Sequence, residues 1–136
     1  MEESAFTKMT RASEYALRFI GWKYVWGGND AHDNGLDCSG LILECLRSVG
    51  LWGQSDTSAH GIFTTLAHKG TIPEHAQKGD LLFFGESRTK INHVTLAINE
   101  WQMIEAGGGS ESLKRGMVRI RPITWRKDLV AILRLT

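Results

Sequence analysis

The period of the apolar residues changes once along this chain, near Pro73, and this change restricts the fold more than any other feature. Before it, apolar residues recur at helical spacing, which predicts helices over Met9–Ile20, Cys38–Val49 and Ser58–His68. After it, short apolar or alternating runs predict about five strands, at 80–84, 93–99, 102–106, 117–123 and 129–135. Helices followed by strands are typical of an α+β domain, here with N-terminal helices packed on a mainly antiparallel sheet.

The ends of the first two helices carry recognisable signals. We expect Thr10 to cap the first helix and Gly21 to end it, because a hydroxyl side chain suits the first position and glycine the last. Gly50 should end the second helix in the same way. Neither an internal repeat nor a linker interrupts the pattern, so residues 1–136 are predicted to form a single domain.

Composition excludes several classes of protein. Sixteen Lys and Arg against fifteen Asp and Glu give a net charge of +1, which offers no electrostatic reason to expect nucleic acid or an anionic membrane as partner. No run approaches the roughly 20 apolar residues of a transmembrane helix. The first residues are acidic and lack an apolar segment, so we expect no classical signal peptide and synthesis in the cytoplasm.

Of the two cysteines, Cys38 is the candidate nucleophile. It lies in the first turn of the second predicted helix, where unpaired N–H groups and the helix dipole favour a thiolate and can also receive an oxyanion. An isolated cysteine is more often a small buried hydrophobe, and that interpretation fits Cys45 on the apolar stripe. On one helix, their Cα atoms would be about 10 Å apart, too far for a disulfide.

A thiolate nucleophile needs a base, and His93 is the best of five histidines. The other four lie in polar loops or on the short third helix, where a solvated position is the simpler interpretation: His32, His60, His68 and His75. His93 opens an alternating strand, and Glu105 lies in the next one, almost equally far from the turn at Asn99. In a hairpin the two would lie about opposite each other, and the carboxylate could orient the imidazole. A structural His93 and a solvent-facing Glu105 remain open alternatives.

Four motifs, in order, resemble those of the NlpC-type cell-wall peptidases, which are small papain-like cysteine peptidases. They are Tyr-Val-Trp-Gly-Gly at 24–28, Asp-Cys-Ser-Gly-Leu at 37–41, Gly-Asp-Leu-Leu-Phe-Phe at 79–84 and Asn-His-Val-Thr-Leu-Ala-Ile at 92–98. The resemblance implies a papain-like fold and cleavage of peptide bonds in bacterial peptidoglycan. It also implies Cys38 as nucleophile, His93 as general base and acid, and the Tyr24 hydroxyl beside the nucleophile. By the same resemblance, three residues shape the site for the stem peptide: Trp26, Asp37 and Ser39.

One position departs from the family pattern. The third catalytic residue is commonly a His in a His-Ala pair, and this chain has Glu105-Ala106 there. A carboxylate can also orient a catalytic imidazole, and it should keep His93 protonated to higher pH. No cofactor is expected, and no metal, because neither C-x-x-C nor H-E-x-x-H spacing is present.

Two further functions remain open besides a peptidoglycan endopeptidase. Amidases and acyltransferases share the permuted papain layout and would use the same thiol on another substrate or acceptor. An inactive wall-binding or virion structural module would keep the fold without turnover, and Glu105 keeps this alternative open. The expected substrate lies outside the cytoplasmic membrane, so we expect delivery by a phage tail or a secretion assembly, or release at lysis.

Overall fold

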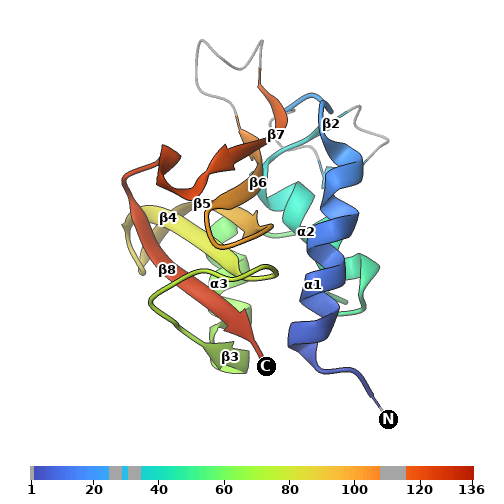
Figure 1. Ribbon diagram of the computed structural model, residues 1–136, viewed down its shortest axis with the longest axis vertical. Coiled ribbons are helices and arrows are strands. Elements are labelled where there is room, and N and C mark those ends of the chain that lie inside the picture. The colour runs from blue at the N-terminus through green and yellow to red at the C-terminus, as the bar shows by residue number, and fades with distance from the viewer. Residues whose placement is uncertain (1, 25–28, 31–34, 108–115) are drawn as a thin grey trace.

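The computed structural model describes residues 2–24, 29–30, 35–107 and 116–136, and it has the predicted α+β architecture (Figure 1). Three α-helices come first: α1 (Ala5–Ala16), α2 (Cys38–Ser48) and α3 (Ala59–Leu66). Short 3-10 turns follow α1 and α3, at Leu17–Phe19 and Ala67–Lys69, and a third occupies Ile123–Trp125. Among the described residues, no helix has the length and apolar character needed to cross a membrane.

The main sheet has six strands in the order β3-β8-β4-β5-β6-β7, and all neighbours are antiparallel. Its strands are β3 (Gly70–Thr71), β4 (Leu81–Ser87), β5 (Lys90–Ala97), β6 (Gln102–Gly107), β7 (Met117–Pro122) and β8 (Leu129–Leu135). The predicted strand count of about five was one too low, because two residues of β3 are too few to show a period. A separate two-stranded ladder joins β1 (Asn29–Asp30) to β2 (Gly35–Leu36).

The first helix begins earlier than predicted. Its N-cap is Ser4, whose hydroxyl accepts the N–H of Thr7 at 3.1 Å, whereas the predicted cap Thr10 lies inside the helix. There the Thr10 hydroxyl donates to the Thr7 carbonyl at 2.7 Å. The prediction of Thr10 was wrong because a threonine can satisfy its hydroxyl within a helix as well as at its start. The helix also ends earlier than the predicted Ile20, at Ala16, and the 3-10 turn Leu17–Phe19 continues it; Gly21 follows that turn with a φ of 90° and does not end the α-helix itself.

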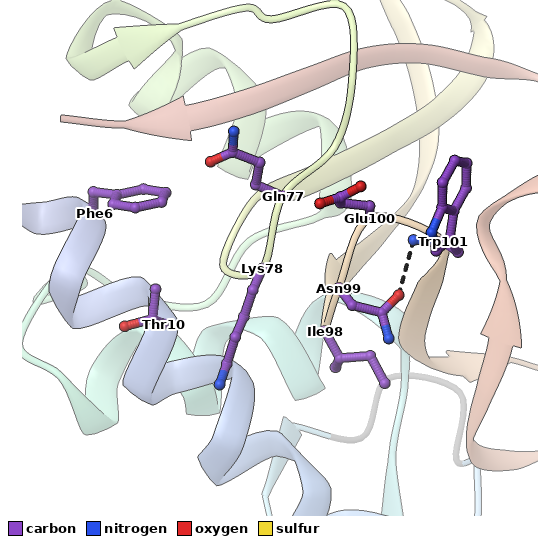
Figure 2. A pocket seen from close by; sticks show the side chains of 8 residues that line it. All are labelled: Phe6, Thr10, Gln77, Lys78, Ile98, Asn99, Glu100 and Trp101. Atoms are coloured by element: carbon purple, nitrogen blue, oxygen red, sulfur yellow. Dashed lines mark hydrogen bonds between the residues drawn. The ribbon is translucent and has the colours of Figure 1, made fainter.

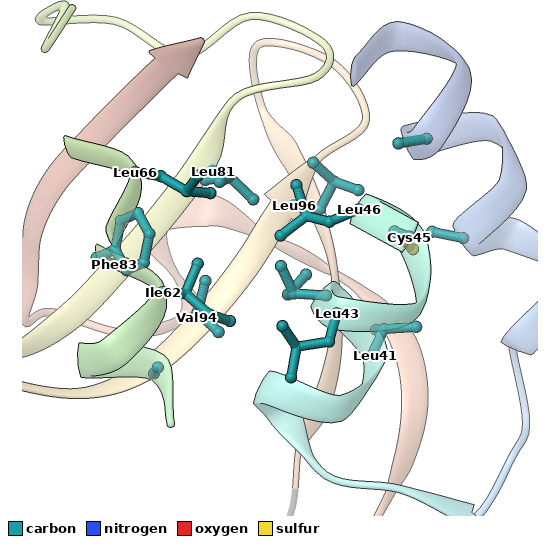
Figure 3. Packing of buried hydrophobic residues seen from close by; sticks show 14 of the residues in the cluster. Leu41, Leu43, Cys45, Leu46, Ile62, Leu66, Leu81, Phe83, Val94 and Leu96 are labelled. Carbon is teal, nitrogen blue, oxygen red and sulfur yellow. The ribbon is translucent and has the colours of Figure 1, made fainter. Parts of the chain in front are cut away.

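The helices pack on one face of the sheet and form the larger core (Figure 3). Leucines of α2 meet side chains of α3, β4 and β5, among them Leu43, Leu46, Ile62, Phe83 and Leu96. A smaller cluster lies on alternate strand positions, at Leu82, Phe84, Ala97, Met103 and Ile132, with Ala76 added from the segment before β4. His93 and Glu105 share the parity of this smaller cluster along β5 and β6. The sheet therefore presents both side chains from the same face.

Candidate active site

Cys38 is the first residue of α2, as the sequence predicts. The preceding residue, Asp37, is the N-cap: its Oδ1 accepts the Gly40 N–H at 2.7 Å and the Ser39 hydroxyl at 3.3 Å. Leu41 N–H bonds to the Asp37 carbonyl at 3.1 Å. The N–H groups of Cys38 and Ser39 are then the ones best placed to receive an oxyanion at this helix end. Asp37 and Ser39, which the resemblance assigns to substrate, also build the start of the helix.

The two thiols differ in their surroundings. Both are free: Cys38 is half-buried, and Cys45 is fully buried in the core. Burial, with a smaller effect from the charge of Glu44, raises the pKa of Cys45 to about 12. Cys45 therefore stays a thiol at neutral pH and serves packing, which agrees with its predicted structural role.

His93 connects Cys38 to Glu105. The imidazole Nε2 lies 2.8 Å from Glu105 Oε1, in a contact that both side chains make while buried, and the ring also hydrogen-bonds with Cys38. Because Nε2 faces the carboxylate, Nδ1 is the nitrogen that remains for the sulfur. Cys38, His93 and Glu105 thus form one chain of hydrogen bonds, which is the arrangement that a thiol nucleophile, its base and an orienting group would need.

The register of the hairpin differs from the one predicted. Leu96 pairs with Ile104 and Ala97 with Met103, and the same register puts Thr95, not His93, across from Glu105. The two catalytic candidates are therefore diagonal neighbours on one face instead of direct partners. This pairing covers only two residues of each strand, and α2 contacts both β5 and β6. The start of α2 can thus reach the part of β5 that carries His93.

The electrostatics of the site favour a charged imidazole. Burial acts to lower the pKa of His93, but the hydrogen bonds and charges of Cys38 and Glu105 outweigh it and raise that pKa to about 9. Burial acts to raise the pKa of Glu105, but its hydrogen bond to His93 and the nearby positive charges lower it below its usual range. At neutral pH the pair is therefore imidazolium and carboxylate, as the sequence led us to expect for a carboxylate partner.

Tyr24 lies beside the start of α2. It forms a parallel bridge with Leu36, two residues before the cysteine, and its N–H donates to the Gly116 carbonyl at 2.9 Å. Burial first, and then the charges of Cys38 and Asp37, raise the pKa of Tyr24 to about 12. Its hydroxyl is therefore a permanent hydrogen-bond donor near the sulfur at any physiological pH.

Arginines on β7 and beyond complete the surroundings of Glu105, and the sequence analysis did not find them. Arg121 Nε lies 2.9 Å from Glu105 Oε2, and Arg126 bonds Asp128 and Asn92 next to His93. Because side chains alternate between the two faces of a strand, Arg119 and Arg121 lie on the same face of β7. This spacing was the sequence signal that could have indicated a pair of arginines near the site. The register between β6 and β7 could not be inferred, because residues 108–115 separate them.

Comparison with known proteins supplies the family. Residues 21–134 match the NlpC/P60 family. The chain belongs to the NlpC/P60 family. It is 31% identical over 98 residues to a gamma-D-glutamyl-L-lysine dipeptidyl-peptidase from Bacillus cereus, covering 71% of this chain and 28% of the relative. It is 29% identical over 134 residues to peptidoglycan endopeptidase RipB from Mycobacterium tuberculosis, covering 83% and 48%. The chain thus spans less than half the length of these curated relatives.

Solved NlpC/P60 structures share the fold. The NlpC/p60 domain of the peptidoglycan hydrolase SagA superposes with a TM-score of 0.69 at 25% identity, over 94% of this chain and 97% of that one. The structure of RipB from Mycobacterium tuberculosis gives a TM-score of 0.67 at 27% identity, over 94% and 66%. The papain-like α+β fold inferred from the four motifs is confirmed by these likenesses.

The remaining sequence candidates of this NlpC/P60 domain are either outside the described residues or on other elements. Trp26 and His32 fall outside the described residues. His60 is on α3, where its Nδ1 accepts the Ile91 N–H at 3.4 Å, and His68 is in the following 3-10 turn. Within the described ranges, no group of three or more His, Cys, Asp or Glu side chains is arranged to hold a metal ion.

A pocket of about 600 Å³ lies away from these groups, between α1 and the turn that joins β5 to β6 (Figure 2). Its lining residues are Phe6, Thr10, Gln77, Lys78, Ile98, Asn99, Glu100 and Trp101. Cys38, His93 and Glu105 do not line it. This pocket is therefore separate from the Cys38–His93–Glu105 group.

Proposed function

We propose that this chain is a cysteine endopeptidase that hydrolyses amide bonds in the stem or cross-link peptides of bacterial peptidoglycan. The observation that carries the proposal is the hydrogen-bonded series of a helix-terminal Cys38, His93 and Glu105. It provides a nucleophile, a base and a group that orients the base, which is what acyl transfer to a thiol requires. The substrate class is supported by the names of the relatives, among them a dipeptidyl-peptidase and a peptidoglycan endopeptidase.

In the first step the Cys38 sulfur attacks the amide carbonyl carbon, with its proton held on His93. A carbon–sulfur bond forms, and the carbonyl electron pair moves to oxygen. The N–H groups of Cys38 and Ser39 and the Tyr24 hydroxyl are the donors proposed for this oxyanion. Removal of one such donor typically costs 100-fold or more in rate, so each can be tested separately.

The intermediate then breaks down to an acyl-enzyme. The carbon–nitrogen bond breaks, and the imidazolium of His93 gives its proton to the leaving amine. A water molecule then attacks the thioester, neutral His93 takes its proton, and the peptide acid leaves as the carbon–sulfur bond breaks. Glu105 stays ionised throughout, where it keeps the ring oriented and stabilises its positive charge.

Asp37, Ser39 and Trp26 are proposed to contact the stem peptide. Asp37 and Ser39 flank the sulfur at the start of α2, where a bound peptide would pass. Because peptidoglycan lies outside the cytoplasmic membrane, we further propose that a phage particle, a secretion assembly or lysis brings the enzyme to its substrate.

The test is digestion of defined muropeptides by the purified chain, followed by mass spectrometry. We expect a pair of products whose masses sum to that of the substrate plus one water. Cys38→Ala should abolish product formation without unfolding the chain. The matched control is Cys45→Ala, which removes the other thiol and should leave hydrolysis nearly unchanged, since Cys45 serves packing.

Alkylation by iodoacetamide against pH gives an independent test without substrate. An activated Cys38 should react faster than an ordinary thiol, because imidazolium beside it favours the thiolate. A Cys38 that reacts only as an ordinary thiol, together with intact muropeptides after digestion, would support the inactive module. Transfer of the acyl group to an amine or a lipid would instead favour an acyltransferase.

A further inference from the structure

The Cys38–His93–Glu105 series leaves one part of its own environment unexplained, the second oxygen of Glu105. Glu105 is 3% exposed. Its Oε1 contacts His93 Nε2, and its Oε2 does not. A buried carboxylate needs partners for both oxygens, because the energetic cost of its dehydration is high. Oε2 lies 2.9 Å from Nε of Arg121, although the N–H does not point along this line, so the contact is an ion pair more than a hydrogen bond.

Arg121 is itself held in place. It lies on β7 opposite Met103, which makes it a diagonal neighbour of Glu105 across the β6–β7 ladder. Its guanidinium carbon lies 4.0 Å from the ring centroid of Trp125, whose other side is largely open to solvent. Its side chain is only 18% exposed. The guanidinium thus contacts the Trp125 ring and the Glu105 carboxylate. The ring attracts the cation, so the side chain loses little further conformational entropy when it contacts the carboxylate.

The other charges near the pair come from several elements. They are Cys38 on α2, Arg119 across from Glu105 on β7, and Arg126 and Asp128 between β7 and β8. Arg126 is bound through both Nε and a terminal nitrogen to Asp128, and it also reaches Asn92. Arg121 forms an ion pair with the carboxylate itself, and its charge lowers the pKa of Glu105 more than that of Arg126 does.

We propose that Arg121 is a positioning residue for the hydrolysis, which fixes the Glu105 carboxylate against the His93 ring and limits the negative charge that the ring experiences. This inference rests on the proposed function, because it concerns the same site. Without Arg121, Oε2 would lose its ion pair while Oε1 stays on Nε2, so the full negative charge of the carboxylate would act on the ring. The His93 proton would also be held more tightly, since the compensating positive charge would be lost. An imidazolium that is too weak an acid transfers its proton to the leaving amine more slowly.

The first measurement follows the His93 ring by NMR in a Cys38→Ala background, where no thiolate competes. In Arg121→Gln we expect the midpoint of the His93 titration to rise by about one pH unit, because removal of a nearby positive charge stabilises imidazolium. Arg121→Lys keeps the charge and should stay close to the parent. Lys127→Gln removes an exposed cation from the segment after β7 and serves as the matched control.

The second measurement is hydrolysis in the Cys38 protein. Arg121→Gln should lower kcat about 10- to 30-fold with little change in KM, Arg121→Lys should restore part of the loss, and Lys127→Gln should match the parent. A His93 midpoint in Arg121→Gln equal to or below that of the parent would overturn the proposal, as would an unchanged kcat. If Arg121→Gln does not fold, Arg121→Lys with parental kcat and KM, despite its lost planar contact, would also overturn it.

The two proposals fail in different ways. If the parent chain does not hydrolyse muropeptides, the proposed function fails, but the NMR titration still decides whether Arg121 controls His93. If the parent is active and the titration does not move, only the role of Arg121 is lost.

Discussion

Two buried carboxylates of this domain are each paired with an arginine from a later strand, and they use that arginine differently. Asp80 is fully buried, and both of its oxygens contact Arg134, from Nε at 2.9 Å and a terminal nitrogen at 2.7 Å. The Gln77 N–H adds a third bond at 2.8 Å. Glu105 contacts Arg121 with one oxygen only and gives the other to His93.

Asp80–Arg134 is a structural ion pair, whereas Glu105–Arg121 also contacts a side chain of the candidate active site. The bidentate Asp80–Arg134 pair is satisfied within itself and fastens β8 to the start of β4. In the Glu105–Arg121 pair only Oε2 of the carboxylate contacts the arginine. Oε1 contacts the imidazole of His93, a side chain that gains and loses a proton. A carboxylate paired with a guanidinium thus joins β8 to the start of β4 in one place, and in the other, as we propose, controls the base on β5.

The largest expected effect is on stability, from Asp80→Ala. It would leave the Arg134 guanidinium with the His75 carbonyl but without its carboxylate, and loss of one member of a buried ion pair costs about 3 to 5 kcal/mol. Urea unfolding measures this difference, with Asp80→Asn as the milder control that keeps one acceptor. Cys38 alkylation in the folded fraction should stay as in the parent. Impaired alkylation would show that the Asp80 pair also serves the site.

Glu105→Gln should produce the opposite profile. We expect a loss of about 100-fold in kcat, equal to about 2.7 kcal/mol, because the amide holds the imidazole less firmly and no longer stabilises its positive charge. The side chain keeps its size, so the free energy of unfolding should fall less than in Asp80→Ala. Full activity in Glu105→Gln would mean that His93 needs no orienting charge, and the distinction between the two pairs would disappear.

Sequence could predict the parts of the site that depend on local pattern. The apolar stripe of α2 placed Cys38 at a helix start, and the symmetry of a short hairpin brought His93 and Glu105 together, although two residues out of register. Arg121 could not be predicted, because its contact depends on how β6 and β7 align across the long connection at 108–115.

Prediction of the fold from sequence has the same limit: local patterns are found and distant contacts are not. Helices with a clear stripe were predicted at nearly their true bounds, but α1 begins at a serine cap that competes with Thr10. The strand β3 exists only because it pairs with β8 at Leu135 and Arg134. Such a two-residue strand depends on its distant partner, and its own sequence carries no signal.

The pH dependence of stability tests the chemical pair alone. The folded pKa of His93 is about 9, above the 6.5 of a free imidazole, so its contribution is complete below about pH 6.5 and is lost as the pH rises through 9. We expect about 3 kcal/mol less stability at pH 9 than at pH 6. In His93→Gln this loss should be absent after correction for other groups. Parallel curves for the two proteins would contradict the assignment.

The smallest effect concerns the aromatic ring beside each arginine. Trp125 lies 4.0 Å from the Arg121 guanidinium carbon, and Phe6 lies 5.9 Å from that of Arg134. Trp125→Leu should cost about 0.5 to 1 kcal/mol of unfolding free energy, and Phe6→Leu less, because the attraction falls with distance.

Trp125→Leu should also lower kcat two- to threefold, since Arg121 meets Glu105 through a single nitrogen and depends on the ring for its position. Arg134 is fixed by two nitrogens, so Phe6→Leu should leave kcat unchanged. Equal effects of the two variants on kcat would show that the ring serves packing alone.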